Sequence, residues 1–169
     1  MKRLRNTSGI PDRLVREVIH WVAANLGITG FDVECRGSSA DIAGLAYNRG
    51  SSYHTTLRPF VVLRVGRAFP RLFAPYQYAQ HKGKRYLLAD RTEALFYITH
   101  ELRHLWQAAQ STDKRKSAPL PRFHGSRGKF SEVDTESYAI HSLRRWRKAR
   151  KIRRISPPLA YWIIDGHQI

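Results

Sequence analysis

Apolar residues near the start of the chain recur every three to four positions, the spacing of a helix that buries one face. These residues are Leu14, Val15, Val18, Ile19, Val22 and Leu26. Pro11 precedes them, where a proline in the first turn is tolerated, and Gly27 and Gly30 follow them, as glycines often do at helix ends. The pattern therefore predicts an amphipathic helix that ends near Gly27.

Short apolar runs then indicate strands. Residues 31–36 (Phe-Asp-Val-Glu-Cys-Arg) alternate between apolar and polar, as a half-buried strand does. Residues 43–47 and 60–65 predict two further strands, joined through a turn-rich stretch. Pro59 places the start of the latter strand at an edge or a bend. Residues 86–89 (Tyr-Leu-Leu-Ala) are another candidate strand.

A second helix is predicted from Asp90, which can cap it together with Glu93, to about Gln110. One face of this helix is an apolar stripe that is expected to face the core. The stripe consists of Leu95, Ile98, Leu102, Leu105 and Ala109. On another face, where a cleft could open, the residues are Glu93, Tyr97, His100, Glu101, His104 and Ala108.

Residues 111–129 are polar and basic, with two prolines and two glycines, and predict a long surface loop that is a candidate lid. Ser131, with Asp134 at the third helical position, is expected to begin a last helix that continues to roughly Arg150. The order of elements predicts one α+β domain over residues 1–169, with a short, mostly antiparallel sheet.

Composition limits the class of protein. A chain of 169 residues with 42% hydrophobic residues fits a single folded domain. No stretch approaches the roughly 18 apolar residues of a membrane span, and the basic start runs into no apolar signal region. Cys35 is the only cysteine, which excludes an intramolecular disulfide and fits a reducing compartment. We therefore expect a cytoplasmic protein with no membrane partner.

The net charge of +17, from 30 Lys and Arg against 13 Asp and Glu, favours an anionic partner such as nucleic acid. The alternative is an Arg-rich composition in general. Cations are densest in the C-terminal helix and tail, about residues 144–169. The cations at the start of this segment are Arg144, Arg145, Arg147, Lys148, Arg150, Lys151, Arg153 and Arg154.

Two interpretations of this basic segment stay open. Arg144, Arg145, Arg147, Lys148 and Lys151 are candidates for phosphate contacts that give salt-sensitive, sequence-independent binding. The alternative is a solvated helix end, where cations also suit the helix dipole. An apolar stripe every third residue is expected to dock this helix on the domain, and it consists of Trp146, Ala149 and Ile152. The apolar run at residues 159–164 predicts a packing segment or a short strand.

His100-Glu101-Leu102-Arg103-His104 is an HExxH motif inside the second predicted helix. Residues four apart on a helix lie about 40° apart in projection, so both imidazoles can reach one metal ion. Glu101 can reach a metal-bound water, whose pKa zinc lowers toward neutrality, and can pass the proton on to the leaving group. The motif predicts a zinc site with Glu101 as general base. The alternative is a pair of solvated histidines.

Catalytic zinc needs a third protein ligand and an open fourth position. Residues 132–139 (Glu-Val-Asp-Thr-Glu-Ser-Tyr-Ala) supply a candidate on the next helix. Glu132 and Glu136 lie one turn apart, so Glu132 can bind the metal while Glu136 orients a histidine. The alternative is two surface glutamates whose charge suits the start of a helix.

HELRH followed by EVDTESYA resembles the gluzincin pattern, in which an ExxxD or ExxA[DN] helix follows HExxH. The chain looks most like minimal domains of the ImmA/IrrE type and the catalytic helices of M48-type peptidases. The resemblance implies a small zincin-like domain with Glu132 as third ligand. It also implies an edge strand beside the metal helix that pairs with a peptide substrate, a part that residues 60–65 or 86–89 would have to play.

Two features depart from this pattern or compete with it. Glu136 stands where the gluzincin-like families often have Asp or Asn. His124 is similar to the distant third histidine of SprT-like (Spartan-type) proteases, which act on DNA-bound proteins, and it is the alternative third ligand. A protease of that kind would also account for the positive charge.

These features predict a zinc-dependent peptidase that acts on a protein or peptide substrate with Glu101 as base. Tyr138 is the candidate that stabilises the polarised carbonyl oxygen, with Tyr97 and Arg103 as further candidates. The alternative function is a basic nucleic-acid-associated or particle-associated protein whose metal site is structural or vestigial.

Overall fold

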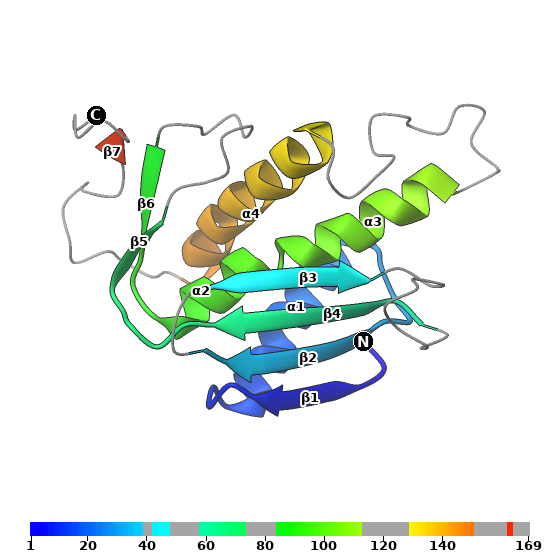
Figure 1. The fold of residues 1–169 in the computed structure, drawn as a ribbon, viewed down its shortest axis with the longest axis horizontal. Coiled ribbons are helices and arrows are strands. Elements are labelled where there is room, and N and C mark those ends of the chain that lie inside the picture. Colours follow the sequence, from blue (N-terminus) through cyan, green and yellow to red (C-terminus); the bar gives the residue numbers. More distant parts are fainter. Residues whose placement is uncertain (39–41, 48–57, 74–83, 113–128, 151–161, 164–169) are drawn as a thin grey trace.

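The computed structural model describes residues 1–38, 42–47, 58–73, 84–112, 129–150 and 162–163, which form helices and two sheets (Figure 1). In chain order the elements are β1 Leu4–Thr7, α1 Asp12–Leu26, β2 Asp32–Gly37, β3 Ala43–Tyr47, β4 Phe60–Val65, β5 Arg71–Phe73, β6 Lys84–Leu88, α2 Arg91–Ile98, α3 His100–Thr112, α4 Lys129–Ala149 and β7 Trp162–Ile163. This content confirms the α+β class. Within these residues, every helix is too short or too polar to cross a bilayer.

The larger sheet has the strand order β1-β2-β4-β3, with β3 at one edge (Figure 1). β1, β2 and β4 are parallel, and β3 alone in this sheet is antiparallel to its neighbour. The prediction of a mostly antiparallel sheet is therefore wrong for this sheet. One reason is that β3 takes the edge, which leaves β2 beside the parallel strand β4; the other is β1, a short segment that does not show the pattern of a strand. The chain passes from β1 to β2 through α1, and a helical crossover of this kind connects neighbouring strands that are parallel.

The smaller sheet is antiparallel and has the order β5-β6-β7. β6 contains most of the strand predicted at residues 86–89, and β7 lies within the apolar run at residues 159–164. A short strand is thus confirmed in that run at residues 162–163.

One hydrophobic core joins the larger sheet to the helices. Val33 and Cys35 of β2 are buried and pair in register with Val61 and Leu63 of β4. The predicted alternation of β2 is confirmed at these positions and at Arg36, which faces solvent, but it is wrong at Glu34, which is buried. α1 covers the same core with the residues that its periodicity predicted, and it ends at Gly27 in the left-handed conformation, with φ 65°.

The predicted helix from Asp90 to Gln110 is two helices, α2 and α3, separated by a turn at Thr99. Asp90 caps α2 as predicted, because its Oδ1 accepts from the backbone N–H groups of Thr92 and Glu93. The Thr99 hydroxyl donates to the carbonyl of Phe96, a local bond that competes with regular helix geometry. His100 therefore begins α3 instead of lying in mid-helix. The predicted apolar stripe is buried except for Ala109, which is exposed.

α4 packs on α2 and α3 (Figure 1). It begins at Lys129, two residues before the predicted Ser131. Trp146 is buried and makes ring contacts with Trp21 and Phe96, at centroid distances of 6.0 and 5.1 Å, which confirms its docking role. Ala149 is exposed, so the predicted stripe of every third residue is wrong at that position. Ile152 lies outside the described residues.

Candidate metal centre

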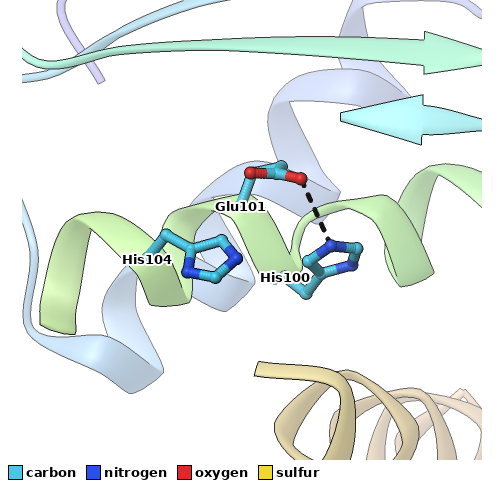
Figure 2. A group of neighbouring side chains, drawn as sticks. All are labelled: His100, Glu101 and His104. Atoms are coloured by element: carbon cyan, nitrogen blue, oxygen red, sulfur yellow. Dashed lines mark ion pairs between the residues drawn. The ribbon is translucent and has the colours of Figure 1, made fainter. Parts of the chain in front are cut away.

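α3 brings together the two histidines and the glutamate of the HExxH motif. One ligand atom from each of His100, Glu101 and His104 lies within 4.8 Å of the others, and no further residue joins this group in the described part of the chain. Figure 2 shows the two imidazoles along one side of α3, with Glu101 on the side toward β3. The predicted proximity of these side chains follows from their helical spacing.

His100 is held through its Nδ1 atom. This atom lies 3.0 Å from the carbonyl oxygen of Tyr97, at the C-terminal end of α2. A carbonyl only accepts, so Nδ1 carries a proton, and Nε2 faces Glu101 Oε1 at 3.2 Å (Figure 2). The turn at Thr99 thus places the carbonyl of Tyr97, near the end of α2, against the side chain of the first residue of α3.

His100 and Glu101 form a buried charged pair. Burial lowers the pKa of His100, but the hydrogen bond and charge of Glu101 outweigh it and raise the pKa to about 9. Burial likewise raises the pKa of Glu101, and the hydrogen bond and charge of His100 lower it below its ordinary value. Glu101 is therefore ionised at neutral pH. A metal ion that binds His100 must compete with its proton.

His104 is held in the same way and faces α4. Its Nδ1 lies 3.0 Å from Gln107 Oε1, and its Nε2 lies 3.6 Å from Glu132 Oε1. In tetrahedral zinc sites with bonds of about 2.0–2.2 Å, neighbouring ligand atoms are about 3.4 Å apart. The spacing between His104 and Glu132 is close to that value, although Glu132 is not part of the group of ligand atoms that lie within 4.8 Å of one another, so its approach is to His104.

β3 lies directly beside Glu101. A Cβ atom on Gly44 would come within 2.4 Å of Glu101 Cγ and 2.6 Å of its Oε1. The missing side chain of Gly44 therefore leaves the space that the Glu101 carboxylate occupies. The strand beside α3 is thus the edge strand β3, and the two ranges expected to play this part are wrong: residues 60–65 are the interior strand β4, and residues 86–89 belong to the other sheet.

The acidic residues of α4 have distinct partners. Asp134 does not cap the helix as predicted, because α4 begins earlier; it accepts two hydrogen bonds from Arg103 and one from Gln107. Glu136 is buried and accepts from the hydroxyl of Tyr97 at 3.3 Å, so it acts on a residue beside His100. The charge of Glu136 contributes to the raised pKa of His100.

The candidates for carbonyl stabilisation lie in different surroundings. Tyr97 has its ring 5.3 Å from that of His100, centroid to centroid. The guanidinium of Arg103 is bound to Asp134 and lies 5.1 Å from the ring centroid of Tyr138. His124, the alternative third ligand, lies outside the described residues, as does the loop considered as a lid for most of its length.

The cations predicted to contact nucleic acid are divided between two roles. Arg147 is largely buried and forms hydrogen bonds with Glu93 and the carbonyl of Leu87. It is therefore a structural residue, which is a correction of the prediction that it contacts phosphate. Arg144, Arg145 and Lys148 are exposed, with Arg145 also bound to Asn25, and Lys151 lies outside the described residues.

Sequence reasoning missed Gln107 and Gly44. Gln107 lies three residues after His104, on the same side of a helix, and that spacing could have indicated it. Gly44 gave no local signal, because its role depends on the packing of β3 against α3. The donor set of two imidazoles and carboxylates fits zinc, although it also suits other divalent transition metals.

Comparison with known proteins assigns no family, because no family model, no curated protein and no solved structure matches this chain. The resemblance of HELRH and EVDTESYA to gluzincins therefore stays a prediction. What the structure adds is the geometry of those segments.

Proposed function

We propose that this protein is a zinc-dependent peptidase whose metal ligands are His100, His104 and Glu132. The observation that carries the proposal is the 3.6 Å approach of Glu132 Oε1 to His104 Nε2, beside the compact group of His100, Glu101 and His104. This approach brings a carboxylate oxygen of α4 to the motif on α3. The ligand set then matches the two histidines and one glutamate of known catalytic zinc sites.

Glu101 is the residue that moves the proton. A bound zinc ion would supply an acidified water and polarise the substrate carbonyl. Glu101 is buried and ionised, so it can accept a proton at a carboxylate oxygen and return it to the leaving nitrogen. The Tyr97 carbonyl and Gln107 hold the two imidazoles by Nδ1, so Nε2 is the atom of each that would bind the metal, at His100 after loss of the proton that it donates to Glu101.

The position of β3 supports a peptide as substrate. β3 is an edge strand of the larger sheet, and its Gly44 lies against Glu101. An extended peptide can add to such an edge through backbone hydrogen bonds, which are the same for every sequence. Pairing along β3 would bring a peptide bond next to Glu101.

The test compares wild type with Glu101→Gln for zinc content and for cleavage of casein and a mixed peptide library. We expect both proteins to bind one zinc ion and the variant to cleave at least about 100-fold more slowly. Glu17→Gln is the matched control, since Glu17 is a half-buried glutamate on α1 that pairs with Arg150, away from the HExxH motif. The proposal fails if wild type binds no zinc, if it cleaves nothing, or if Glu101→Gln cleaves as fast as wild type.

A further inference from the structure

A chain of hydrogen bonds connects α4 to His104. At its far end, Arg103 donates to Asp134 from Nε at 2.8 Å and from Nη2 at 3.0 Å, a two-point contact between α3 and α4. The guanidinium of Arg103 also lies 3.6 Å from the centroid of the Trp106 ring. The side chains of Arg103 and Asp134 are mostly buried, with exposures of 17% and 26%. Such planar, two-point pairs fix orientation as well as distance.

Gln107 connects this pair to the histidine. Its Nε2 lies 2.9 Å from Asp134 Oδ2, and its Oε1 lies 3.0 Å from His104 Nδ1. An ionised carboxylate only accepts hydrogen bonds, so the amide nitrogen of Gln107 must face Asp134. The amide oxygen then faces His104 and accepts from Nδ1. Gln107 is 2% exposed, which leaves little room for the amide to turn over.

The direction of these bonds determines which nitrogen of His104 is left for a metal. With its proton on Nδ1, the neutral imidazole presents a lone pair at Nε2, the atom that faces Glu132. Asp134 lies two residues after Glu132 on α4, so the contact that orients Gln107 also holds the helix that carries the proposed third ligand. One pair of residues thus acts on two ligands at once.

We propose that Gln107 is a positioning residue for His104, and that Asp134 and Arg103 set its orientation. This inference rests on the proposed function for its metal, but not for the hydrogen bonds themselves. It goes beyond the HExxH pattern and the downstream acidic helix, neither of which assigns a role to Gln107.

A matched control exists on the same helix. Arg147 of α4 makes a two-point contact with Glu93 of α2, through the same pair of guanidinium nitrogens. This contact continues to two backbone groups, the N–H of Ala89, which donates to Glu93, and the carbonyl of Leu87, which accepts from Arg147. Glu93→Gln should therefore disturb folding without disturbing His104.

The experiment measures zinc affinity by competition with a chelating dye, together with ¹⁵N shifts of the His104 ring in the metal-free protein. We expect Gln107→Ala to weaken zinc binding about 10- to 100-fold and to yield a mixture of the two neutral tautomers. Gln107→Glu alone places two carboxylates together and should also weaken binding. The double variant Gln107→Glu/Asp134→Asn allows an amide to donate to the new carboxylate and should recover most of the affinity.

The outcomes separate this inference from the proposed function. If wild type binds zinc and Gln107→Ala binds it equally well, the positioning role is overturned, while the metal site stands. If wild type binds no zinc, the proposed function fails, and the tautomer measurement still decides the role of Gln107. Equal loss of zinc affinity in Glu93→Gln would show a general effect of destabilisation and would also overturn it.

Discussion

The two halves of α4 each make a two-point arginine–carboxylate contact, and the contacts have different surroundings. In the first half, Asp134 receives Arg103 of α3. In the second half, Arg147 reaches Glu93 of α2, and the exposures of those side chains are only 13% and 8%. The second contact is the more deeply buried, and it lies next to Trp146, which packs on Phe96.

The difference between the halves lies in what each contact connects to. The Glu93 contact continues to backbone groups of residues 87 and 89, so it joins α4 to the chain that leads into α2. The Asp134 contact continues through Gln107 to a ring nitrogen of His104. The same ionic chemistry therefore serves the fold at one end of α4 and a candidate metal ligand at the other.

The largest expected effect is on folding, in the second half. Glu93→Gln leaves the buried Arg147 without a charged partner, and we expect a loss of about 3–5 kcal/mol in the free energy of unfolding. Urea denaturation of the metal-free protein measures it. Zinc affinity of the folded fraction should not change. A weakened zinc affinity would contradict the separation of the two halves.

The next largest effect is on catalysis, where Gly44 of β3 lies against Glu101 of α3. Gly44→Ala adds a methyl group where Glu101 now lies, so the carboxylate must shift, and a shift of about 1 Å can cost about 100-fold in rate. We expect that loss in kcat for peptide cleavage with zinc content retained. Leu45→Ala is the control on the same strand, since Leu45 is 45% exposed. Full activity in Gly44→Ala would show that Glu101 does not need this space.

Removal of zinc should affect the two halves of α4 differently, without any substitution. At free zinc 100-fold above the dissociation constant, binding adds about 2.7 kcal/mol of stability. Because the proposed ligands lie on α3 and the first half of α4, a chelator should increase local amide exchange most at residues 100–107 and 132–139. Residues 143–147 should change less when measured by hydrogen exchange. A uniform change along α4 would contradict this division.

Local patterns in the sequence predicted the elements that bear the site. The period of α1 and the cap at Asp90 each depend on neighbouring residues, and both are confirmed, whereas the alternation of β2 is broken by the buried Glu34. The closeness of His100, Glu101 and His104 follows from the four-residue spacing in the same way.

Features that depend on tertiary packing could not be predicted. The parallel pairs depend on β1, which is recognisable only by its pairing with β2, and on the edge position of β3, which leaves β2 beside β4. Asp134 has the position of a capping residue by local rules, and its actual partners, Arg103 and Gln107, come from another helix. Arg147 looked like one of many surface cations until its contact with Glu93 was known. In each case the deciding contact lies far away along the chain.

The smallest expected effect is the folding cost of Asp134→Asn. Asp134 is more exposed than Glu93, at 26% against 8%, so its contact with Arg103 is better solvated. We expect a loss of only about 1 kcal/mol in the free energy of unfolding, again by urea denaturation without metal. Zinc should nevertheless bind about 10-fold more weakly, because one carboxylate acceptor becomes an amide donor and the side chain at position 134 no longer requires the nitrogen of Gln107 to face it. Asp134→Asn and Glu93→Gln make the same chemical change at the two ends of α4. If Glu93→Gln costs more stability while Asp134→Asn costs more zinc affinity, the first half of α4 acts on the site itself. If the variant that loses more stability also loses more zinc affinity, both contacts act on the site only through the stability of the fold.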